Sequence, residues 1–343
     1  MSATRKCWRM LPKAGSIKNL KLTEEEVADP AGNEVQVEVK AIGLNFADIF
    51  AMYGLYGATP EKSFVPGLEY SGIIKKVGGN VTTTKPGDMV MGITKFGGYT
   101  SIINIDVDYV SPLPDGWSFE EGAAFLVQML TAYWALIELA RIKKGDTVLI
   151  QSAAGGVGIW ANRLAKNFEA YTIGGIGSAY KSDLLKQEGY DDYILRSKGF
   201  KNDLIGKLNG RPLNIVLECI GGEIFKSSYD LLARNGKMVV YGSARYGQTG
   251  DRPNYLKLAA KYFTRPKIDP QKMIEQNKAV LGFNLIYLYD MKDRLKEILE
   301  DLNNYDLGKP VVGHTFDFPE LKRAVKLFQT GKTQGKVVVR VLN

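Results

Sequence analysis

A glycine-rich turn between an apolar strand and a helix constrains the fold of this chain more than any other feature. Residues 147–151 (TVLIQ) are uninterruptedly apolar until the last position, as in strands buried on both faces of a parallel sheet. The turn AAGGVG (153–158) follows, and apolar side chains at helical spacing continue to Phe168. Gly155 would let the backbone approach a pyrophosphate, and Gly158 would let helix and strand pack closely. This order of strand, turn and helix predicts a dinucleotide-binding unit.

Strand and helix patterns continue to alternate after this turn. Alternating units of this length indicate an α/β fold with a parallel, doubly wound sheet, here predicted within 128–283. A long insert, 243–278, precedes the last strand; it contains NYLKLAAKYF and a helix that begins at Asp269 and Pro270. Inserts of this length often form lids or interface elements. The further expected strands are 171–175, 192–195, 214–218, 237–241 and 279–283.

The first part of the chain has a different pattern. Residues 35–41 (VQVEVKA) alternate apolar and polar side chains, which is typical of a half-buried strand. Short strands are also expected at 71–78, 88–94 and 99–105, separated by turns rich in Gly and Pro. After residue 283 a helix (290–304), a strand (310–316), a helix (319–330) and a strand (336–342) resume this mixed character. We therefore expect a discontinuous β-rich domain made of 1–127 and 284–343.

The end of the second strand of the dinucleotide unit indicates which nucleotide binds. Sites for NAD carry an acidic residue about 20 residues after the glycine turn, where it bonds the ribose 2′-hydroxyl. Here Ser178 stands at that point and Lys181 follows, so a 2′-phosphate would meet a hydroxyl and an ammonium group. One charge-assisted contact contributes about 1.5–3 kcal/mol. The sequence favours NADPH, with Arg196 as a further contact; the alternative is that Lys181 only caps a solvated helix.

Scarce histidine and cysteine limit the possible chemistry. The 343 residues include one His and two Cys, whereas zinc sites are usually built from several of these residues together. We therefore expect no metal site. His314 and Cys219 are interpreted as structural, because no nucleophile–base arrangement accompanies them. Cys7 and Cys219 are remote in sequence, so a reducing, cytoplasmic compartment is expected.

Charge and hydropathy argue against two classes of partner. The net charge of +8 is spread along the chain among acidic residues, which favours a solvated surface over a nucleic-acid face. No apolar run reaches the roughly 20 residues that a membrane span needs, and the first residues lack the pattern of a signal peptide. No transmembrane segment is expected, and peripheral membrane association stays open.

Several motifs together resemble the medium-chain dehydrogenase/reductase superfamily. They are GLNFADIF (43–50), PGLEYSG (66–72), GDMVMG and AAGGVG, and the resemblance covers nearly the whole chain. It implies a Rossmann-type domain inserted in a β-rich GroES-like domain. Leu68 stands where the zinc-containing branch carries a His, and Asn45 lies in the stretch that would hold a Cys. The chain is thus similar to the zinc-free quinone oxidoreductase branch. NFADIFAMYGLY, LLARNGKMVVYG and NKAVLGFNLIYL are most similar to the group related to the vesicle amine transport protein.

This resemblance also implies roles for individual residues. Asn45 and Thr131 would lie at the nicotinamide and are the expected catalytic residues, together with Tyr53 as a possible proton donor beside water or Tyr56. Asp48 would support the loop that carries Asn45. The full set of expected cofactor residues is Asn45, Thr131, Ala153, Gly155, Gly156, Val157, Gly158, Ser178, Lys181, Arg196, Gly221, Gly242, Ser243, Phe283, Leu285 and Lys336.

Two functions from different classes follow. The first is a zinc-independent, NADPH-dependent oxidoreductase that transfers hydride to a quinone or an α,β-unsaturated carbonyl, since conjugation spreads the developing charge. Phe50 stands where many quinone oxidoreductases carry a Tyr, so a substrate-orienting hydroxyl is missing. The second is a nucleotide-binding protein with little or no turnover that acts through membrane or protein association. The resemblance also implies a homodimer through the last strand of the sheet and the insert 243–278.

Overall fold

In the computed structural model, which describes residues 3–342, the alternating segment near the N-terminus becomes the central strand of one sheet. This strand, β3 (Glu34–Gly43), buries Val35, Val37 and Val39 on one face, as the alternation predicts. It pairs antiparallel with β4 (Glu69–Val77) and β15 (Lys336–Arg340), so residues from both ends of the chain meet in one sheet. The strand order is β14-β15-β3-β4-β5-β7, and β6 also pairs with β3.

The remaining elements of this part are short. The strands expected at 71–78 and 88–94 are β4 and β5, while the one expected at 99–105 begins later, at Ile102. The backbone of Tyr99 and Thr100 pairs instead with that of Trp8 and Cys7. The N-terminal pair β1 and β2 has no counterpart among the expected strands. These elements are β1 (Ala3–Met10), η1 (Ile17–Asn19), β2 (Leu20–Val27), α1 (Phe46–Tyr53), β5 (Met89–Ile93), β6 (Ile102–Asp106), η2 (Val107–Tyr109), β7 (Val110–Pro112), α2 (Phe119–Gly122), β14 (Val312–Asp317), η8 (Phe318–Glu320) and α11 (Leu321–Gln329).

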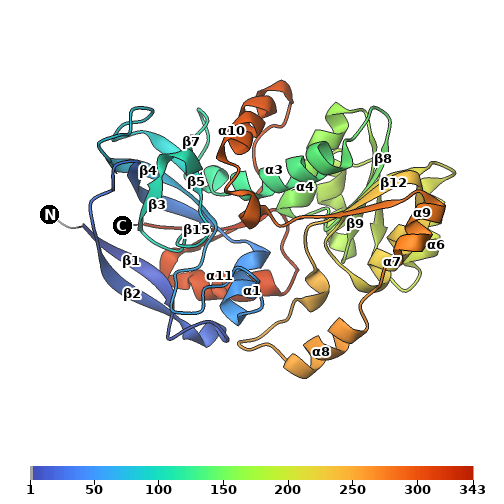
Figure 1. Ribbon diagram of the computed structural model, residues 1–343, viewed down its shortest axis with the longest axis horizontal. Coiled ribbons are helices and arrows are strands. Elements are labelled where there is room, and N and C mark those ends of the chain that lie inside the picture. The colour runs from blue at the N-terminus through green and yellow to red at the C-terminus, as the bar shows by residue number, and fades with distance from the viewer. Residues whose placement is uncertain (1–2, 343) are drawn as a thin grey trace. The chain divides into compact units, whose positions relative to one another are not determined.

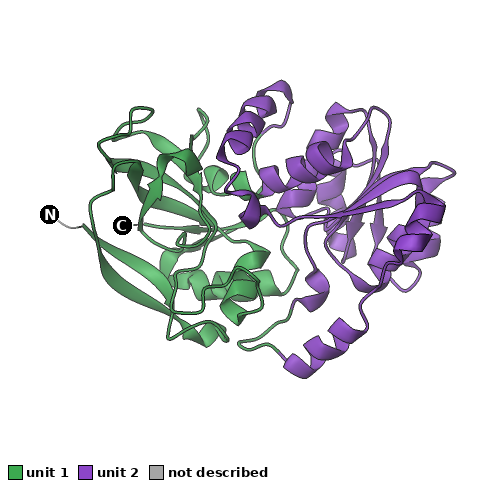
Figure 2. Cartoon of the chain, in the orientation of Figure 1, with its two compact units in different colours: residues 1–127, 248–253, 309–343 green, residues 128–247, 254–308 purple. Residues whose placement is uncertain are grey.

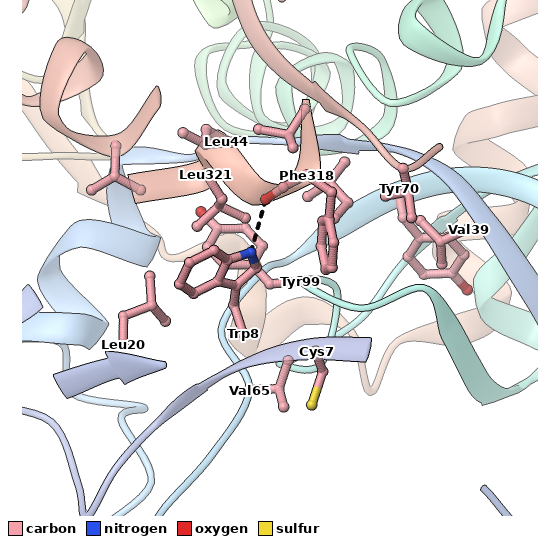
Figure 3. Packing of buried hydrophobic residues seen from close by; sticks show 14 of the residues in the cluster. Cys7, Trp8, Leu20, Val39, Leu44, Val65, Tyr70, Tyr99, Phe318 and Leu321 are labelled. Carbon is pink, nitrogen blue, oxygen red and sulfur yellow. Dashed lines mark hydrogen bonds between the residues drawn. The ribbon is translucent and has the colours of Figure 1, made fainter. Parts of the chain in front are cut away.

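The core of this part joins the two ends of the chain. The indole N–H of Trp8 donates to the Phe318 carbonyl at 2.9 Å (Figure 3). Tyr70, Tyr99 and Leu321 are fully buried in the same cluster. Burial of large apolar side chains of this kind stabilises each by about 1.5–3 kcal/mol.

The second sheet has six parallel strands in the order β10-β9-β8-β11-β12-β13, as expected for a doubly wound fold. Helices lie on both sides of this sheet (Figure 1). Its strands are β8 (Thr147–Gln151), β9 (Tyr171–Ile176), β10 (Asp192–Leu195), β11 (Leu213–Glu218), β12 (Leu232–Val240) and β13 (Ala279–Gly282). Its helices are α3 (Leu126–Tyr133), η3 (Trp134–Ala140), α4 (Gly156–Asn167), η4 (Ala179–Lys181), α5 (Ser182–Gln187), α6 (Phe200–Leu208), α7 (Gly222–Leu231), η5 (Ala244–Tyr246), α8 (Tyr255–Phe263), α9 (Pro270–Gln276), η6 (Leu285–Leu288), α10 (Lys292–Asp301) and η7 (Leu302–Asn304).

The chain divides into two units (Figure 2). The point at which the chain returns from unit 2 to unit 1 lies later in the sequence than expected. Unit 1 runs to Val127, and includes Gln248–Pro253 and the segment from Lys309 onward. Unit 2 is Gln128–Gly247 with Asn254–Gly308, so the return expected at residue 284 occurs at 309. The reason is that α10 is bound to unit 2: its Arg294 pairs with Glu138 of η3, and its Asp301 accepts from the Tyr133 hydroxyl of α3.

Candidate functional site

The glycine turn of unit 2 has the shape that a pyrophosphate needs. Helix α4 begins at Gly156 with Gly155 as N-cap, and no side chain caps it. A Cβ on Gly158 would lie 2.6 Å from the Ala153 Cα, so only glycine allows the helix this close to the turn that follows β8. A Cβ on Gly155 would contact only the Ser152 carbonyl, at 3.2 Å. The first N–H groups of this helix and its positive dipole end therefore suit an anion.

Three residues predicted to select the nucleotide lie together beyond β9. Ser178 and Lys181 form one turn, in which the Lys181 N–H donates to the Ser178 carbonyl at 3.2 Å. Arg196 donates from Nη1 to the Gly175 carbonyl at 3.1 Å, and its Nη2 lies 2.8 Å from where Gly177 would carry a Cβ. Two cationic side chains thus flank the end of the second strand.

The electrostatics of this pair favour a bound anion. Lys181 is only 9% exposed, and burial, followed by the charge of Arg196, lowers the pKa of its ammonium group to about 8. Burial also lowers the pKa of Arg196. Two partly buried positive charges repel each other, and a phosphate beside them would relieve both the repulsion and the desolvation. These residues fit the 2′-phosphate of NADPH.

The loops after β11 and β12 complete the same edge of the sheet. Glu218 accepts hydrogen bonds from the Ile220 and Gly221 N–H groups at 2.5 and 2.6 Å. Gly221 has φ +87°, and a Cβ there would lie 3.4 Å from the Ser243 Oγ. A Cβ on Gly242 would lie 3.2 Å from the Cys219 Cβ. Because the carboxyl ends of parallel strands share one edge, Gly221, Gly242 and Ser243 lie at the same edge as the glycine turn.

Three further expected cofactor residues also belong to unit 2. Thr131 is 8% exposed and lies one turn after Gln128, against whose side chain a Cβ on Gly156 would clash at 2.6 Å. Phe283 follows β13, and its N–H donates to the Val240 carbonyl at 3.2 Å. Leu285 is 8% exposed and begins η6. Thr131 is thus placed on the helix that contacts the glycine turn, and Phe283 at the carboxyl edge of the sheet.

Unit 1 contains a buried polar cluster around Asn45. The Asn45 Nδ2 donates to Glu69 Oε1 at 2.8 Å, and its Oδ1 accepts from the Lys336 Nζ at 3.1 Å. Lys336 also forms an ion pair with Glu69, and both side chains are almost fully buried. Glu69 Oε2 accepts from the Val127 N–H at 3.2 Å. Both ends of the Asn45 amide are therefore held in one orientation.

Asp48 extends this cluster and carries an unusual carboxyl group. Its Oδ2 accepts from the Asn45 N–H and from the Tyr99 hydroxyl, both at 2.8 Å. Its Oδ1 is buried and has no hydrogen-bond partner among residues 3–342. Burial raises the pKa of Asp48 to about 7, and these hydrogen bonds and the charge of Lys336 offset only part of the effect. Asp48 thus holds the N-terminus of α1 and Asn45 in place while keeping a proton near neutral pH.

Tyr53 lies at the other end of α1 from Asn45. The helix has eight residues, which separates its two ends by about 12 Å at 1.5 Å per residue. The Tyr53 hydroxyl donates to the Gly250 carbonyl at 2.6 Å and accepts from the Gln329 Nε2 at 2.5 Å. The structure does not bring Tyr53 to Asn45, and its hydroxyl links α1, α11 and the segment Gln248–Pro253 within unit 1.

The sequence interpretation left two members of the Asn45 cluster without a role. Glu69 and Tyr99 both lie in segments with the pattern of ordinary strands or turns. The available signal was that Glu69 and Lys336 each stand at the first position of a strand, with opposite charges. Which charges pair depends on the antiparallel contacts of β3 with β4 and β15, which local patterns do not encode.

Residues 3–342 contain neither a metal cluster nor an exposed apolar helix of membrane-spanning length. In that range no group of three or more His, Cys, Asp or Glu side chains is arranged to hold a metal ion. One run, Phe119–Ala140, is long and apolar enough to cross a bilayer, but 83% of its most apolar window is buried inside the protein, as in a core helix. His314 lies in β14 opposite Val337, and Cys7 and Cys219 are free thiols.

Comparison with known families agrees with this geometry. Residues 156–301 match the family described as zinc-binding dehydrogenase, and residues 31–115 match the alcohol dehydrogenase GroES-like domain. The first match begins within the glycine turn and covers most of unit 2, and the second covers β3 to β7. The expected fold class, a Rossmann-type sheet with a β-rich GroES-like domain, is confirmed.

Individual proteins are similar over most of the chain. The human synaptic vesicle membrane protein VAT-1 homolog is 32% identical over 95% of this chain and 84% of its own length. The chain spans 64% of the length of the zebrafish VAT-1 homolog. The Escherichia coli quinone oxidoreductase complexed with NADPH has a TM-score of 0.84 and 30% identity, covering 99% of this chain and 100% of that one. The CurK enoyl reductase has a TM-score of 0.84 and 27% identity, covering 98% and 99%. The chain therefore belongs to the medium-chain dehydrogenase/reductase superfamily, close to VAT-1 homologs and quinone oxidoreductases.

Proposed function

We propose that this protein is an NADPH-dependent oxidoreductase that transfers hydride to a quinone or an α,β-unsaturated carbonyl. The observation that carries the nucleotide choice is the cationic pair Lys181 and Arg196 with Ser178, beyond the second strand of the sheet. The similar E. coli quinone oxidoreductase was solved as a complex with NADPH, which supports the same nucleotide here.

Each part of the nucleotide has a candidate partner in unit 2. The glycine turn with the start of α4 would hold the pyrophosphate, and Ser178, Lys181 and Arg196 would hold the 2′-phosphate. Bound NADPH supplies the hydride. The further expected contacts are Gly221, Gly242, Ser243, Phe283, Leu285 and Thr131 at the sheet edge and on α3.

The acceptor class is inferred from the groups that unit 1 offers. Hydride addition to a conjugated carbonyl spreads negative charge onto oxygen, so that one or two fixed donors stabilise it. Asn45 and Lys336 supply an amide and an ammonium group, oriented by Glu69. The similarity to a quinone oxidoreductase and an enoyl reductase is consistent with such acceptors.

Tyr53 is a poor proton donor by its surroundings. Its hydroxyl is already bonded to Gly250 and Gln329, and burial raises its pKa further above the ordinary value. We therefore propose water as the source of the final proton, and a structural role for Tyr53.

Nucleotide selection is tested by calorimetric binding of NADPH and NADH to the full chain. Wild-type protein is expected to bind NADPH about ten- to a hundred-fold more tightly. Lys181→Ala should weaken NADPH binding by about tenfold or more and leave NADH binding unchanged, because only the 2′-phosphate contact is lost. Lys186→Ala, an exposed lysine on α5, is the matched control. Equal affinity of the wild type for both nucleotides would refute the assignment.

Acceptor class is tested by NADPH oxidation with quinones, enones and unconjugated ketones. Turnover with conjugated acceptors and none with unconjugated ketones is expected. Tight NADPH binding without turnover on any quinone or enone would instead favour the second function, a nucleotide-binding protein that acts by association. The names of the VAT-1 homologs and Phe50 in place of Tyr motivate that alternative.

We also propose that the protein forms a homodimer and resides in a reducing compartment. Strand β13 is one of the two outer strands of the six-stranded sheet, so its edge suits pairing with a second copy. Light scattering should then report a homodimer, and a monomer at micromolar concentration would contradict it. The two free thiols suit a reducing compartment such as the cytoplasm.

A further inference from the structure

The hydroxyl group of Tyr190 is bonded to the glycine turn 153–158. It donates to the Gly158 carbonyl at 2.8 Å and lies 3.4 Å from the Ala153 carbonyl oxygen. A tyrosine hydroxyl has one proton to donate, so the shorter contact is the main bond and the longer one shares the same proton. Tyr190 is 9% exposed, and burial raises the pKa of its hydroxyl well above the ordinary value, so it stays a donor near neutral pH. One oxygen atom thus connects both ends of the turn.

A glycine in the neighbouring strand makes room for this ring. Gly174 lies in the interior of β9, where glycine normally weakens a strand. A Cβ there would lie 2.9 Å from the Ala153 Cβ and 3.2 Å from the Tyr190 Cδ1. It would also lie 2.4 Å from the Leu185 Cδ2. Gly174 therefore lets the Tyr190 ring and the glycine turn approach the same point of the sheet.

The segment that carries Tyr190 is bound to α4 at a second point as well. Asn162 Nδ2 donates to the Glu188 carbonyl at 2.6 Å. The Arg163 guanidinium donates two hydrogen bonds to the Glu188 carboxylate, at 2.7 and 2.9 Å. Asn162 lies one turn after Gly158, on the same side of the helix. Because these bonds anchor the segment independently, loss of the Tyr190 hydroxyl should leave the segment in place.

The position of the Tyr190 contact connects it to the nucleotide. The N–H groups of the first turn of α4 are the ones proposed above to meet the pyrophosphate, and the orientation of that turn fixes their direction. The Gly158 carbonyl belongs to this first turn, and Ala153 belongs to the chain that enters it. A donor that holds both carbonyls keeps the N–H groups directed at the ligand before it binds. Such preorganisation raises affinity, because less ordering is required on binding.

We propose that Tyr190 is a positioning residue for the dinucleotide, which sets the glycine turn and the start of α4 for the pyrophosphate. This role rests on the proposed function, because it requires that a dinucleotide binds. Tyr190 acts at the part that NADPH and NADH share, whereas Lys181 and Arg196 act at the part in which they differ. Loss of the hydroxyl should therefore weaken both nucleotides equally and leave the preference for NADPH unchanged.

The test is calorimetric titration of wild type and Tyr190→Phe, a variant that loses one oxygen atom and keeps the ring. One hydrogen bond corresponds to about a two- to tenfold change in affinity. The affinities for NADPH and NADH should both fall by this factor. The affinity for adenosine 2′-monophosphate, which carries the 2′-phosphate without a pyrophosphate, should equal that of wild type. Lys181→Ala should give the reverse pattern, with adenosine 2′-monophosphate and NADPH weakened and NADH unchanged.

Arg163→Met is the matched control. It releases the same segment from α4 at Glu188, beyond the first turn of the helix. This variant should unfold at a lower urea concentration than wild type and bind NADPH with wild-type affinity. A purely structural role of Tyr190 would give the same result for Tyr190→Phe, namely lower stability with unchanged affinity.

Two results would overturn the role of Tyr190 while nucleotide binding by wild type stands. One is wild-type affinity of Tyr190→Phe for NADPH. The other is a loss of affinity for adenosine 2′-monophosphate as large as the loss for NADPH. Failure of wild type to bind either dinucleotide would instead refute the proposed function, and the role of Tyr190 with it.

Discussion

At the scale of single residues, Asn45 shows how a side chain is fixed by charges that lie far away in sequence. Glu69 and Lys336 bind its two ends, and the ion pair between them is almost fully shielded from water. Such a pair adds little net stability compared with apolar residues, but removal of one partner leaves a buried charge.

Replacement of either Glu69 or Lys336 alone should therefore lower the free energy of unfolding more than replacement of both. Lys336→Met is expected to lower the free energy of unfolding by about 3–5 kcal/mol, because the Glu69 carboxylate loses its counterion. Glu69→Gln combined with Lys336→Met should recover much of that loss. Urea denaturation of the two single variants and the double variant measures the coupling. Additive losses would show that the two charges do not interact in the folded protein.

The raised pKa of the Asp48 carboxyl group predicts that the stability of the protein depends on pH. Its folded-state pKa is about 7, well above the value of about 4 in an unfolded chain. The proton is therefore held more tightly in the folded state, and stability should fall by up to about 1.4 kcal/mol per pH unit between about pH 4 and 7. Asp48→Asn should remove this component of the slope.

The measurement is the free energy of unfolding of wild type and Asp48→Asn at pH values from about 3 to 8, which brackets both pKa values. The variant is expected to gain stability relative to wild type as pH rises through this range. Asp115→Asn, which removes an exposed carboxylate, is the control. A constant difference between wild type and Asp48→Asn would contradict a raised pKa.

At the scale of elements, the contact of α4 with the turn that follows β8 depends on one missing side chain. Gly158→Ala would place a methyl group 2.6 Å from both the Ala153 Cα and its carbonyl oxygen. Although alanine normally favours a helix over glycine by about 1 kcal/mol, overpacking against backbone costs about 1–3 kcal/mol. A net loss of stability and weaker NADPH binding are expected, since the helix start must shift.

Gly206 on α6 is the matched control for this substitution. A Cβ there would meet nothing within 4 Å, so Gly206→Ala should be neutral or stabilise by up to about 1 kcal/mol. Thermal unfolding and NADPH titration of both variants provide the comparison. Similar effects of Gly158→Ala and Gly206→Ala on stability and NADPH binding would contradict the overpacking expected at Gly158.

At the scale of the whole molecule, the proposed nucleotide should stabilise the folded chain. A ligand that binds only the folded state adds about 2.7 kcal/mol at a hundred times its dissociation constant. The melting temperature should rise by roughly 2–4 °C with NADPH, and by less with the same concentration of NADH. Differential scanning calorimetry measures both. Identical shifts would contradict selection by Lys181 and Arg196.

Much of the sheet architecture and half of the candidate site could be predicted from local patterns. The strand 147–151, the glycine turn and the absence of an acid before Lys181 each lie within a short stretch, where residue types directly determine conformation and charge. The pairing of Asn45 with Glu69 and Lys336 could not be predicted, because it joins residues up to 291 positions apart. The return to unit 1 lies later than expected because α10 is held by contacts with α3 and η3, which its own pattern does not reveal.

Local sequence patterns were sufficient to predict the two kinds of domain, the nucleotide turn and the positive charge at its ribose end. Three features depend on the folded chain: which buried charges neutralise each other, the hydrogen bonds of the Tyr53 hydroxyl with Gly250 and Gln329, and the hydrogen bond from the Tyr190 hydroxyl to the Gly158 carbonyl. The physical reason is the range of the interactions. Backbone preference and periodicity act over a few residues, whereas burial and ion pairing depend on segments that meet only when the sheets have formed.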